Sequence, residues 1–178
     1  SPLSFYQVNR RGAEQLYAAA ADFAALTGRE TLLDLYCGAG TIGLSMAKRV
    51  KQLIGVEIIP EAVENARANA LRNGVENARF LCGDAADAAL ALEREGISPD
   101  VVVIDPPRKG CAPGLNEPIA RMNPERVVMV SCDSATAARD AASFNALGYR
   151  PVRVQAVDMF PRTAHVECVV LMQRLRAD

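Results

Sequence analysis

The sequence lacks the features that mark membrane, secreted and metal-binding proteins. It has no uninterrupted apolar run of the roughly 18 residues needed to cross a bilayer, and its first residues do not follow the charged-then-apolar pattern of a signal peptide. Its five cysteines form no Cys-x-x-Cys pair, which argues against a zinc knuckle and a disulfide framework. We therefore expect a soluble, cytoplasmic protein with free thiols, no membrane partner and no bound metal.

The sequence also lacks an excess of positive charge. Its 20 Lys and Arg residues are balanced by 21 Asp and Glu residues, giving a net charge of −1 and a pI of about 5.9. A nucleic-acid ligand would therefore have to meet a local basic patch or another domain. The length is typical of one domain, residues 1–178, and the abrupt start at Ser1 favours a piece of a longer protein.

Short apolar runs rich in β-branched residues recur along the chain and are the expected strands. These runs are residues 31–35, 53–56, 78–81, 101–104, 127–130, 152–157 and 166–172. Alanine-rich segments with helical periodicity lie between them, such as residues 60–72, and residues 12–26 are expected to form an amphipathic helix before the first strand. This alternation predicts a doubly wound α/β fold with a mainly parallel seven-stranded sheet. Only a short segment around residues 158–164 lies between the last two runs, so we expect the runs to form an antiparallel pair at one edge.

Residues 32–43 are typical of a strand, a glycine turn and the start of a helix. Gly38, Gly40 and Gly43 satisfy the G-x-G-x-x-G pattern of dinucleotide binding, which by itself is weakly specific. Asp34 discriminates between ligands, because its carboxylate would repel a pyrophosphate on this turn and attract a cationic amine. The turn therefore favours a cofactor without phosphate over the nicotinamide cofactor of a dehydrogenase.

An acidic residue lies at the end of each of the first four expected strands: Asp34, Glu57, Asp84 and Asp105. Ligands of parallel sheets bind at these carboxyl ends. Glu57 lies 17 positions after Gly40, near the spacing at which an acid binds a ribose diol, and Asp84 is a candidate partner for an adenine amino group. S-adenosylmethionine carries an ammonium, a diol, an aminopurine and a sulfonium, so we predict that it is the cofactor. The alternative for each acid is a helix cap or a solvated strand end.

Three further residues are candidates for the reaction itself. Arg108 follows two prolines that stiffen its loop, and it suits a phosphate or a developing enolate oxygen, with a surface ion pair as the alternative. Cys132 follows the fifth expected strand at the start of a helix, which is expected to lower the pKa of its thiol; the alternative is a small buried apolar side chain. Glu167 is a candidate base, and otherwise an ordinary edge-strand acid.

Together these motifs resemble those of the RNA uracil-5-methyltransferases. Their residues are most similar to those of the bacterial enzymes that methylate 23S ribosomal RNA. The resemblance spans nearly the whole chain and lies in residues 4–9, 105–110, 131–132 and 158–167. It implies a Rossmann-like class I methyltransferase in which Cys132 is the nucleophile and Glu167 the base. It also implies cofactor contacts by Gln7, Tyr36, Glu57 and Asp105, beside those expected of Asp34, Gly38, Gly40 and Asp84.

The resemblance implies a reaction in which Cys132 adds to carbon 6 of a uracil and carbon 5 accepts the methyl group, leaving S-adenosylhomocysteine as the product. Arg108 would stabilise the enolate and Glu167 would remove the proton from carbon 5. Ribosomal RNA is the expected substrate and tRNA the alternative. A cofactor-binding module with a structural cysteine, or a methyltransferase acting on an exocyclic amine, are competing interpretations.

Two features set this chain apart from the family pattern. Relatives carry an N-terminal RNA-binding β-barrel, and some carry an iron–sulfur cluster, ahead of this region; we therefore expect RNA affinity to come largely from a domain absent from this chain. The family usually has Ser-Cys-Asn-Pro where this chain has Asp133 and Ser134 after the cysteine. We expect this exchange to loosen the turn, raise the thiol pKa and reduce activity.

Overall fold

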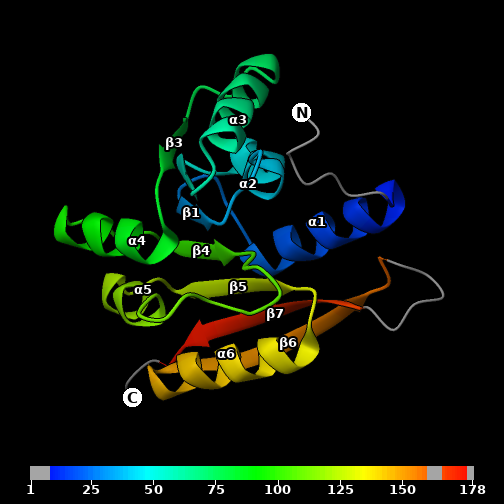
Figure 1. Ribbon diagram of the computed structural model, residues 1–178, viewed down its shortest axis with the longest axis vertical. Helices are drawn as coiled ribbons and strands as arrows, with labels where there is room; N and C mark the ends of the chain where they lie inside the picture. Colours follow the sequence, from blue (N-terminus) through cyan, green and yellow to red (C-terminus); the bar gives the residue numbers. More distant parts are fainter. Residues whose placement is uncertain (1–8, 160–165, 176–178) are drawn as a thin grey trace.

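The computed structural model describes residues 9–159 and 166–175, which form a seven-stranded sheet with helices on both of its faces (Figure 1). Its strands are β1 (Thr31–Leu35), β2 (Gln52–Glu57), β3 (Ala78–Cys82), β4 (Val101–Ile104), β5 (Arg126–Ser131), β6 (Tyr149–Val157) and β7 (Glu167–Arg174). Its helices are α1 (Arg10–Ala24), α2 (Thr41–Met46), α3 (Pro60–Arg72), α4 (Ala85–Arg94), α5 (Asn116–Met122) and α6 (Ser134–Ala146), with a short 3-10 helix, η1 (Ala47–Arg49).

The strand order in the sheet is β3-β2-β1-β4-β5-β7-β6. Strands β1 to β5 are parallel, and β7 pairs antiparallel with both β5 and β6. This confirms the predicted doubly wound fold and the antiparallel pair at one edge. The last strand in sequence does not take the outer position, however, because β7 inserts between β5 and β6. Its first residue is thereby brought to the carboxyl end of β5.

Two apolar layers hold the sheet to its helices. Alternate side chains of the central strands enter opposite layers, so that Leu32 packs with α1, α2 and α3, whereas Leu33 packs with α4, α5 and α6. Strands β1 and β4 are buried on both faces, which explains their continuous apolar sequence. Each fully buried leucine, isoleucine or valine of these layers stabilises the fold by roughly 1.5–3 kcal/mol.

The helix before the first strand begins two residues earlier than predicted. The side chain of Asn9 accepts a hydrogen bond from the amide of Gly12 at 3.0 Å and caps the helix, so Arg10 is its first residue. The helix over residues 60–72 has the predicted bounds, with Pro60 in the first turn. Within residues 9–159 and 166–175, no helix combines the length and apolar character that a membrane span requires.

Candidate functional site

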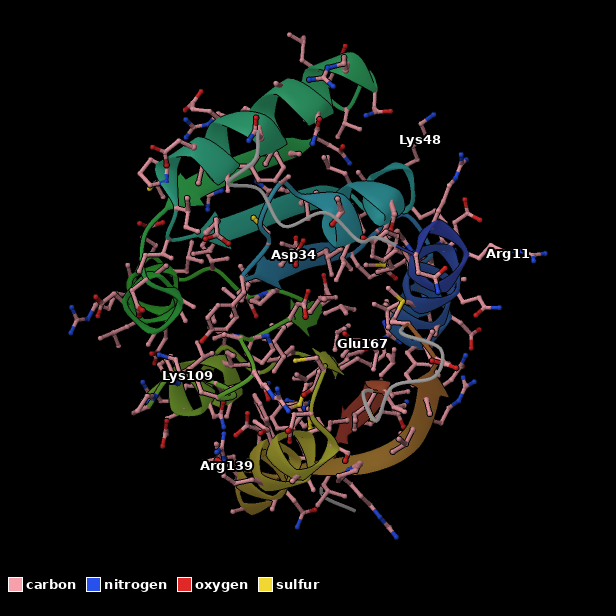
Figure 2. All side chains as sticks on the ribbon, turned by 45° about the vertical axis from the view of Figure 1, so that its right-hand side comes forward. Arg11, Asp34, Lys48, Lys109, Arg139 and Glu167 are labelled. Carbon is pink, nitrogen blue, oxygen red and sulfur yellow. The ribbon has the colours of Figure 1, made fainter. Side chains whose placement is uncertain are left out.

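A cavity of about 810 Å³ opens at the carboxyl ends of the parallel strands, between α1 and the loop that follows β4. This volume is in the range of small-molecule sites, roughly 300–1,000 Å³. Figure 2 shows Asp34 and Glu167 in the middle of the molecule, with Lys109 and Arg139 on one side and Arg11 on the other. The fold therefore places the cavity at the edge of the sheet where the acidic residues were predicted to gather.

The turn after β1 has a backbone that leaves room for a ligand. Tyr36, Gly38 and Gly40 all have positive φ angles, of 62°, 54° and 80°, and a side chain at Gly38 would meet no atom within 4 Å. Tyr36 and Gly38 line the cavity, whereas Gly40 does not; it caps α2 from a left-handed conformation. The space above Gly38 is the kind of cradle that a bound cofactor would fill.

Asp34 lies beneath this turn and does not line the cavity. It is completely buried, and its carboxylate accepts a hydrogen bond from the amide of Gly43 at 2.9 Å. Burial, reinforced by the charge of Glu57 and opposed by the Gly43 amide, raises the pKa of Asp34 to about 7. The placement gives no support to the contact that we predicted between Asp34 and a cationic amine. Asp34 instead fixes the start of α2 to the end of β1.

Glu57 and Asp84 line the cavity and also bind the backbone. Glu57 is buried, and its two oxygens accept hydrogen bonds from the amides of Gly38 and Ile59, both at 2.9 Å. Asp84 caps α4 by accepting from the amide of Ala86 at 2.8 Å. The cap that we considered as the alternative for Asp84 is therefore real, and it does not remove the carboxylate from the cavity. Each carboxylate oxygen has a second lone pair, so both acids retain acceptor capacity toward a ligand.

Asp105 directly follows β4 and lines the cavity beside Glu167. Burial, together with the negative charges of Glu167 and Asp34, raises the pKa of Asp105 to about 8. Glu167 and Asp34 thus lie close enough to Asp105 to oppose its ionisation. Such a cluster attracts cationic ligands and retains protons that isolated carboxylates would release.

Cys132 and Glu167 come together through the antiparallel register of β5 and β7. Ser131 pairs with Cys168, so the next position of the same register sets Cys132 across from Glu167. Both residues line the cavity; Glu167 is buried, and the Cys132 thiol is partly exposed. Chain positions 35 residues apart are therefore joined in one place by the insertion of β7.

Contrary to our prediction, the pKa of the Cys132 thiol is raised. Burial and the negative charge of Glu167 are the main causes, with a further contribution from Asp105, and they outweigh the nearby Arg108 guanidinium. Burial also raises the pKa of Glu167. The prediction of a lowered pKa considered only the start of α6 and was wrong because it omitted the acids that neighbouring strands bring to the thiol. The separate expectation that Asp133 raises this pKa has the observed direction, but Glu167 and Asp105 are the acids that cause the rise.

The turn after Cys132 is held by its own hydrogen bonds although it lacks the family's proline. The hydroxyl of Ser131 donates to the carbonyl of Asp133 at 3.0 Å and accepts from its amide at 3.2 Å. Asp133 then caps α6 by accepting from the amide of Thr136 at 2.9 Å. Its second oxygen lies 3.8 Å from the guanidinium of Arg108, which is mostly exposed and also lines the cavity. Arg108 therefore has the ion pair that we considered as its alternative.

The contribution of α1 to this cavity was not predicted. Five of its residues line the cavity, and four of them, Arg10, Ala13, Glu14 and Tyr17, follow the i, i+3, i+4, i+7 spacing of one helix face, which was the signal available; Leu16 is the fifth. Gln7, the remaining predicted cofactor contact, lies outside the described residues. All five cysteines are free, and the described part of the chain contains no cluster of three His, Cys, Asp or Glu residues suited to a metal ion.

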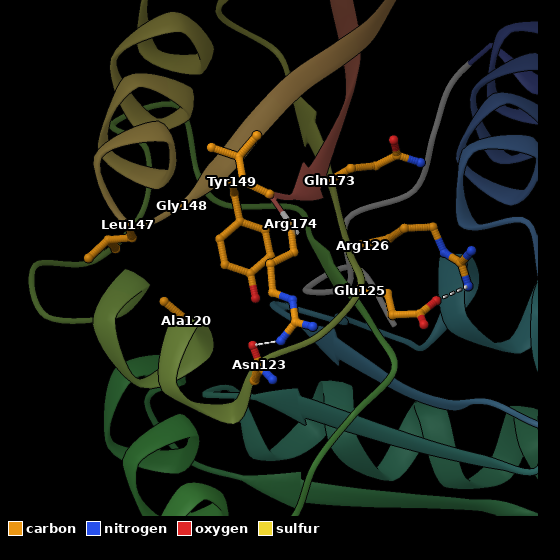
Figure 3. Close-up of a pocket in the computed structure, with 10 residues that line it drawn as sticks. Ala120, Asn123, Glu125, Arg126, Leu147, Gly148, Tyr149, Gln173 and Arg174 are labelled. Carbon is orange, nitrogen blue, oxygen red and sulfur yellow. Dashed lines mark hydrogen bonds and ion pairs between the residues drawn. The ribbon is translucent and has the colours of Figure 1, made fainter. Parts of the chain in front are cut away.

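A second cavity, of about 970 Å³, lies at the opposite end of β5, between α5, β6 and the end of β7 (Figure 3). Its charged side chains are engaged with one another or with neighbouring amides: Arg174 donates to Asn123, and Arg126 lies 3.7 Å from Glu125. None of the candidate site residues in the described ranges lines it. The first cavity is therefore the candidate site.

Comparison with known proteins identifies the family. The sequence model of the tRNA (Uracil-5-)-methyltransferase family matches residues 2–175. An uncharacterized RNA methyltransferase of Clostridium acetobutylicum is 50% identical over 175 residues, which cover 98% of this chain and 38% of that protein. A relative in Staphylococcus epidermidis, also described as an uncharacterized RNA methyltransferase, is 47% identical over 98% of this chain and 38% of its own length.

Solved structures agree with this assignment. The crystal structure of Pyrococcus abyssi tRNA (uracil-54, C5)-methyltransferase in complex with S-adenosyl-L-homocysteine is 36% identical, with a TM-score of 0.80 over 96% of this chain and 40% of that one. A SAM-dependent methyltransferase from Agrobacterium tumefaciens, 16% identical with a TM-score of 0.70 over 96% of this chain and 63% of that one, shares the fold. These likenesses confirm the predicted Rossmann-like class I methyltransferase fold. The chain spans about 38% of the length of the curated relatives that it matches. It belongs to the tRNA (Uracil-5-)-methyltransferase family.

Proposed function

We propose that residues 1–178 form the catalytic domain of an S-adenosylmethionine-dependent RNA uracil-5-methyltransferase, part of a longer protein. The observation that carries the proposal is that Cys132 and Glu167 line the same cavity as Glu57, Asp84 and Asp105. A thiol, a base and a cofactor site are all needed within one cavity for this reaction. The family membership supports the same reaction type.

The cavity suits S-adenosylmethionine in shape and in charge. The open space above Gly38 lets a ligand approach the backbone of the glycine turn. The carboxylates of Glu57 and Asp84 are acceptors for a diol and an amino group. The Pyrococcus abyssi relative was solved with S-adenosyl-L-homocysteine, which supports the same cofactor here. When bound, the cofactor supplies an electrophilic methyl group and leaves as S-adenosylhomocysteine.

Cys132 starts the reaction as the nucleophile. Its sulfur bonds to carbon 6 of the uracil, and the electrons of the carbon 5–carbon 6 double bond move toward the oxygen on carbon 4. Arg108 lines the cavity with an exposed guanidinium that stabilises this enolate charge. Because the thiol pKa is raised, Cys132 is mostly protonated at neutral pH, and its proton passes to solvent before the sulfur attacks carbon 6.

Glu167 completes the reaction as the base. Carbon 5 carries both the new methyl group and its original proton, and the Glu167 carboxylate removes that proton. The electrons left on carbon 5 restore the double bond and expel the Cys132 sulfur. A raised Glu167 pKa strengthens the carboxylate as a proton acceptor. The target base must leave its stack to reach this cavity, so a single-stranded or flipped uridine is the substrate.

We infer that the RNA is 23S ribosomal RNA, on the sequence resemblance of the loop and cysteine motifs, with tRNA as the alternative. The name of the Pyrococcus abyssi relative favours the alternative. A chain with a net charge of −1 offers little general attraction to phosphates. We therefore propose that most RNA affinity comes from parts of the protein outside residues 1–178. A cytoplasmic location stays a prediction.

The proposal is tested with 5-fluorouridine RNA, because fluorine at carbon 5 blocks the final proton removal and traps the adduct. Full-length protein is incubated with S-adenosylmethionine and fluorinated 23S rRNA or tRNA, and covalent species are detected by mass spectrometry. We expect an adduct in the wild type and in Cys82→Ala, an exposed cysteine outside the cavity, and none in Cys132→Ala. The RNA that gives the adduct identifies the substrate class.

Two outcomes would contradict the proposal. Cofactor binding without an adduct in any variant would favour a cofactor-binding module whose cysteine is structural. Methylation of normal RNA by Cys132→Ala would favour an enzyme that acts on an exocyclic amine.

A further inference from the structure

The loop that follows β4 is bound along its backbone by α6, the helix that begins two residues after Cys132. The hydroxyl of Thr136 lies within hydrogen-bond distance of two acceptors, the carbonyl of Arg108 at 3.2 Å and the carboxylate of Asp133 at 3.1 Å, and its one hydrogen is shared between them. One residue further along the loop and three residues further along the helix, the guanidinium of Arg139 donates to the carbonyl of Lys109 at 2.8 Å. Two successive carbonyls of the loop are therefore held by side chains from one helix.

Asp140 adds a third bond and fixes the arginine. Its carboxylate is buried and accepts a hydrogen bond from the amide of Cys111 at 2.8 Å. Its other oxygen accepts from two nitrogens of Arg139, at 3.0 and 2.8 Å. A buried carboxylate whose oxygens bind a backbone amide and a guanidinium in this way resists displacement. Loss of the guanidinium would leave the charge unpaired, and loss of the amide would leave one oxygen without its hydrogen bond.

Gly110 shows how closely the loop is pressed against the helix. Its φ angle is +91°, and a side chain there would lie 2.0 Å from the Arg139 guanidinium and 2.5 Å from Asp140 and Thr136. Its amide also donates to the carbonyl of Pro107 at 2.7 Å, which closes the turn. Only glycine accommodates this approach without a shift of the loop or the helix.

The far end of the same loop is bound to the cofactor side of the cavity. The amide of Ala112 donates to the hydroxyl of Tyr36 at 3.0 Å, and Tyr36 belongs to the turn after β1. The loop therefore bridges two parts of the cavity: the glycine turn, and the helix that follows Cys132.

We propose that Asp140, Arg139 and Thr136 are positioning residues that hold the loop over residues 105–112 at a fixed distance from Cys132. None of the three lines the cavity, so they act through the loop rather than on the substrate. The inference rests on the proposed function, in which residues at the start of this loop contact substrate and cofactor. Reactions of this kind are sensitive to position, since a misplacement of about 1 Å can cost about a hundredfold in rate.

The test compares Asp140→Asn, Arg139→Gln and the double variant in the full-length protein. Glu93→Gln is the matched control, because Glu93 and Arg121 form an exposed ion pair elsewhere on the molecule. A second pair of variants distinguishes the hydrogen bond of the Thr136 hydroxyl from the shape of the side chain. Thr136→Val keeps the shape but loses the donor, whereas Thr136→Ser keeps the donor. Hydrogen exchange of the amides in residues 108–112 reports the loop, and the rate of adduct formation with 5-fluorouridine RNA reports the reaction.

We expect exchange in residues 108–112 to speed up at least about tenfold in Asp140→Asn, Arg139→Gln and Thr136→Val, and to stay unchanged in Glu93→Gln and Thr136→Ser. Adduct formation should fall by about ten- to a hundredfold in the same three variants, with S-adenosylmethionine affinity changed by less than about twofold. The double variant should be no slower than the slower single variant, because the two side chains act as one unit.

Unchanged exchange in residues 108–112 would overturn the proposal, whatever the reaction. Faster exchange with an undiminished rate would also overturn it, because the loop would then be held without a consequence for Cys132. Equal losses in the rate of adduct formation and in cofactor affinity would also contradict the proposal, because they would indicate a general structural role for the three residues. Failure of the proposed function would give a different result, because the wild type itself would then form no adduct. Hydrogen exchange in residues 108–112 would still show whether Asp140, Arg139 and Thr136 hold the loop.

Discussion

Glu167 lies across from Cys132, one position beyond the pair that Ser131 makes with Cys168 in the antiparallel register of β5 and β7. The carboxylate and burial together raise the pKa of the thiol. A neutral thiol beside a carboxylate is stable until substrate binds, and it is less open to oxidation than an exposed thiolate. In the proposed reaction, the same carboxylate is then in place for the removal of the proton from carbon 5.

Replacing Glu167 with Gln should separate the two halves of the proposed reaction. The amide retains the shape of the side chain but cannot accept the proton from carbon 5, so turnover should fall by about a hundred- to ten-thousandfold. A covalent protein–RNA species should then accumulate on ordinary uridine RNA, visible by denaturing electrophoresis. Glu61→Gln, an exposed acid at the start of α3, serves as the control, and wild-type turnover in Glu167→Gln would exclude this residue as the base.

The rate of adduct formation by the wild type should rise with pH up to and beyond the ordinary thiol range. Thiolate is the reactive form, and burial together with the Glu167 charge raises the pKa of Cys132, while Asp105 adds to the effect and Arg108 opposes it. Removing the carboxylate in Glu167→Gln should therefore shift the profile to lower pH. Initial adduct rates measured from about pH 6 to about pH 10 test this, and an unshifted profile would contradict it.

Glu57 should determine cofactor affinity. Glu57→Gln keeps one acceptor oxygen but loses the charge-assisted hydrogen bond that we propose to the ribose, so binding of S-adenosylmethionine should weaken by about ten- to a hundredfold. Titration calorimetry measures the affinity, and thermal unfolding without ligand checks that the turn survives, since Glu57 also binds the amides of Gly38 and Ile59. Affinity equal to that of the wild type would place the ribose elsewhere.

Asp34 should make the protein less stable as pH rises from about 4 to about 7. Its pKa is raised from 3.8 to about 7, so the folded state keeps a proton that the unfolded state releases. The free energy of unfolding therefore falls with pH in this window, by at most about 1.4 kcal/mol per pH unit. Asp34→Asn should reduce the slope and raise stability at neutral pH by roughly 1–3 kcal/mol.

Urea unfolding at several pH values tests this prediction, with Asp87→Asn, an exposed acid in the first turn of α4, as the control. Some slope should remain in Asp34→Asn because the pKa of Asp105 is also raised, to about 8. A slope equal to that of the wild type would show that Asp34 is ionised in the folded protein.

The elements of this fold were predictable because their causes are local. The apolar run over residues 101–104 coincides with β4, and the helix over residues 60–72 has its predicted bounds. Several strands extend one residue further than their apolar cores, as with Arg126–Ser131, since sheet pairing continues into flanking polar residues. The cap by Asn9, which moved the first helix by two residues, is also local but was overlooked.

The site was predictable as a set of residues but not as an arrangement. Sequence order indicated that Glu57, Asp84 and Asp105 would end at one edge of the sheet, and all three line the cavity. It gave no means to see that Asp34 faces inward to Gly43. It also could not show that α6 holds the loop after β4 through Asp140.

The sequence by itself determined the alternation of strands and helices, the glycine turn and the choice of reactive side chains, because each depends on residues near one another in the chain. Only the tertiary structure decided that β7 enters between β5 and β6. That choice sets Glu167 beside Cys132, and the Glu167 charge opposes the lowering of the thiol pKa that the start of α6 alone predicted. Strand order depends on packing between distant segments, and a pKa depends on every charge and desolvating atom around a group, so neither can be read from local sequence.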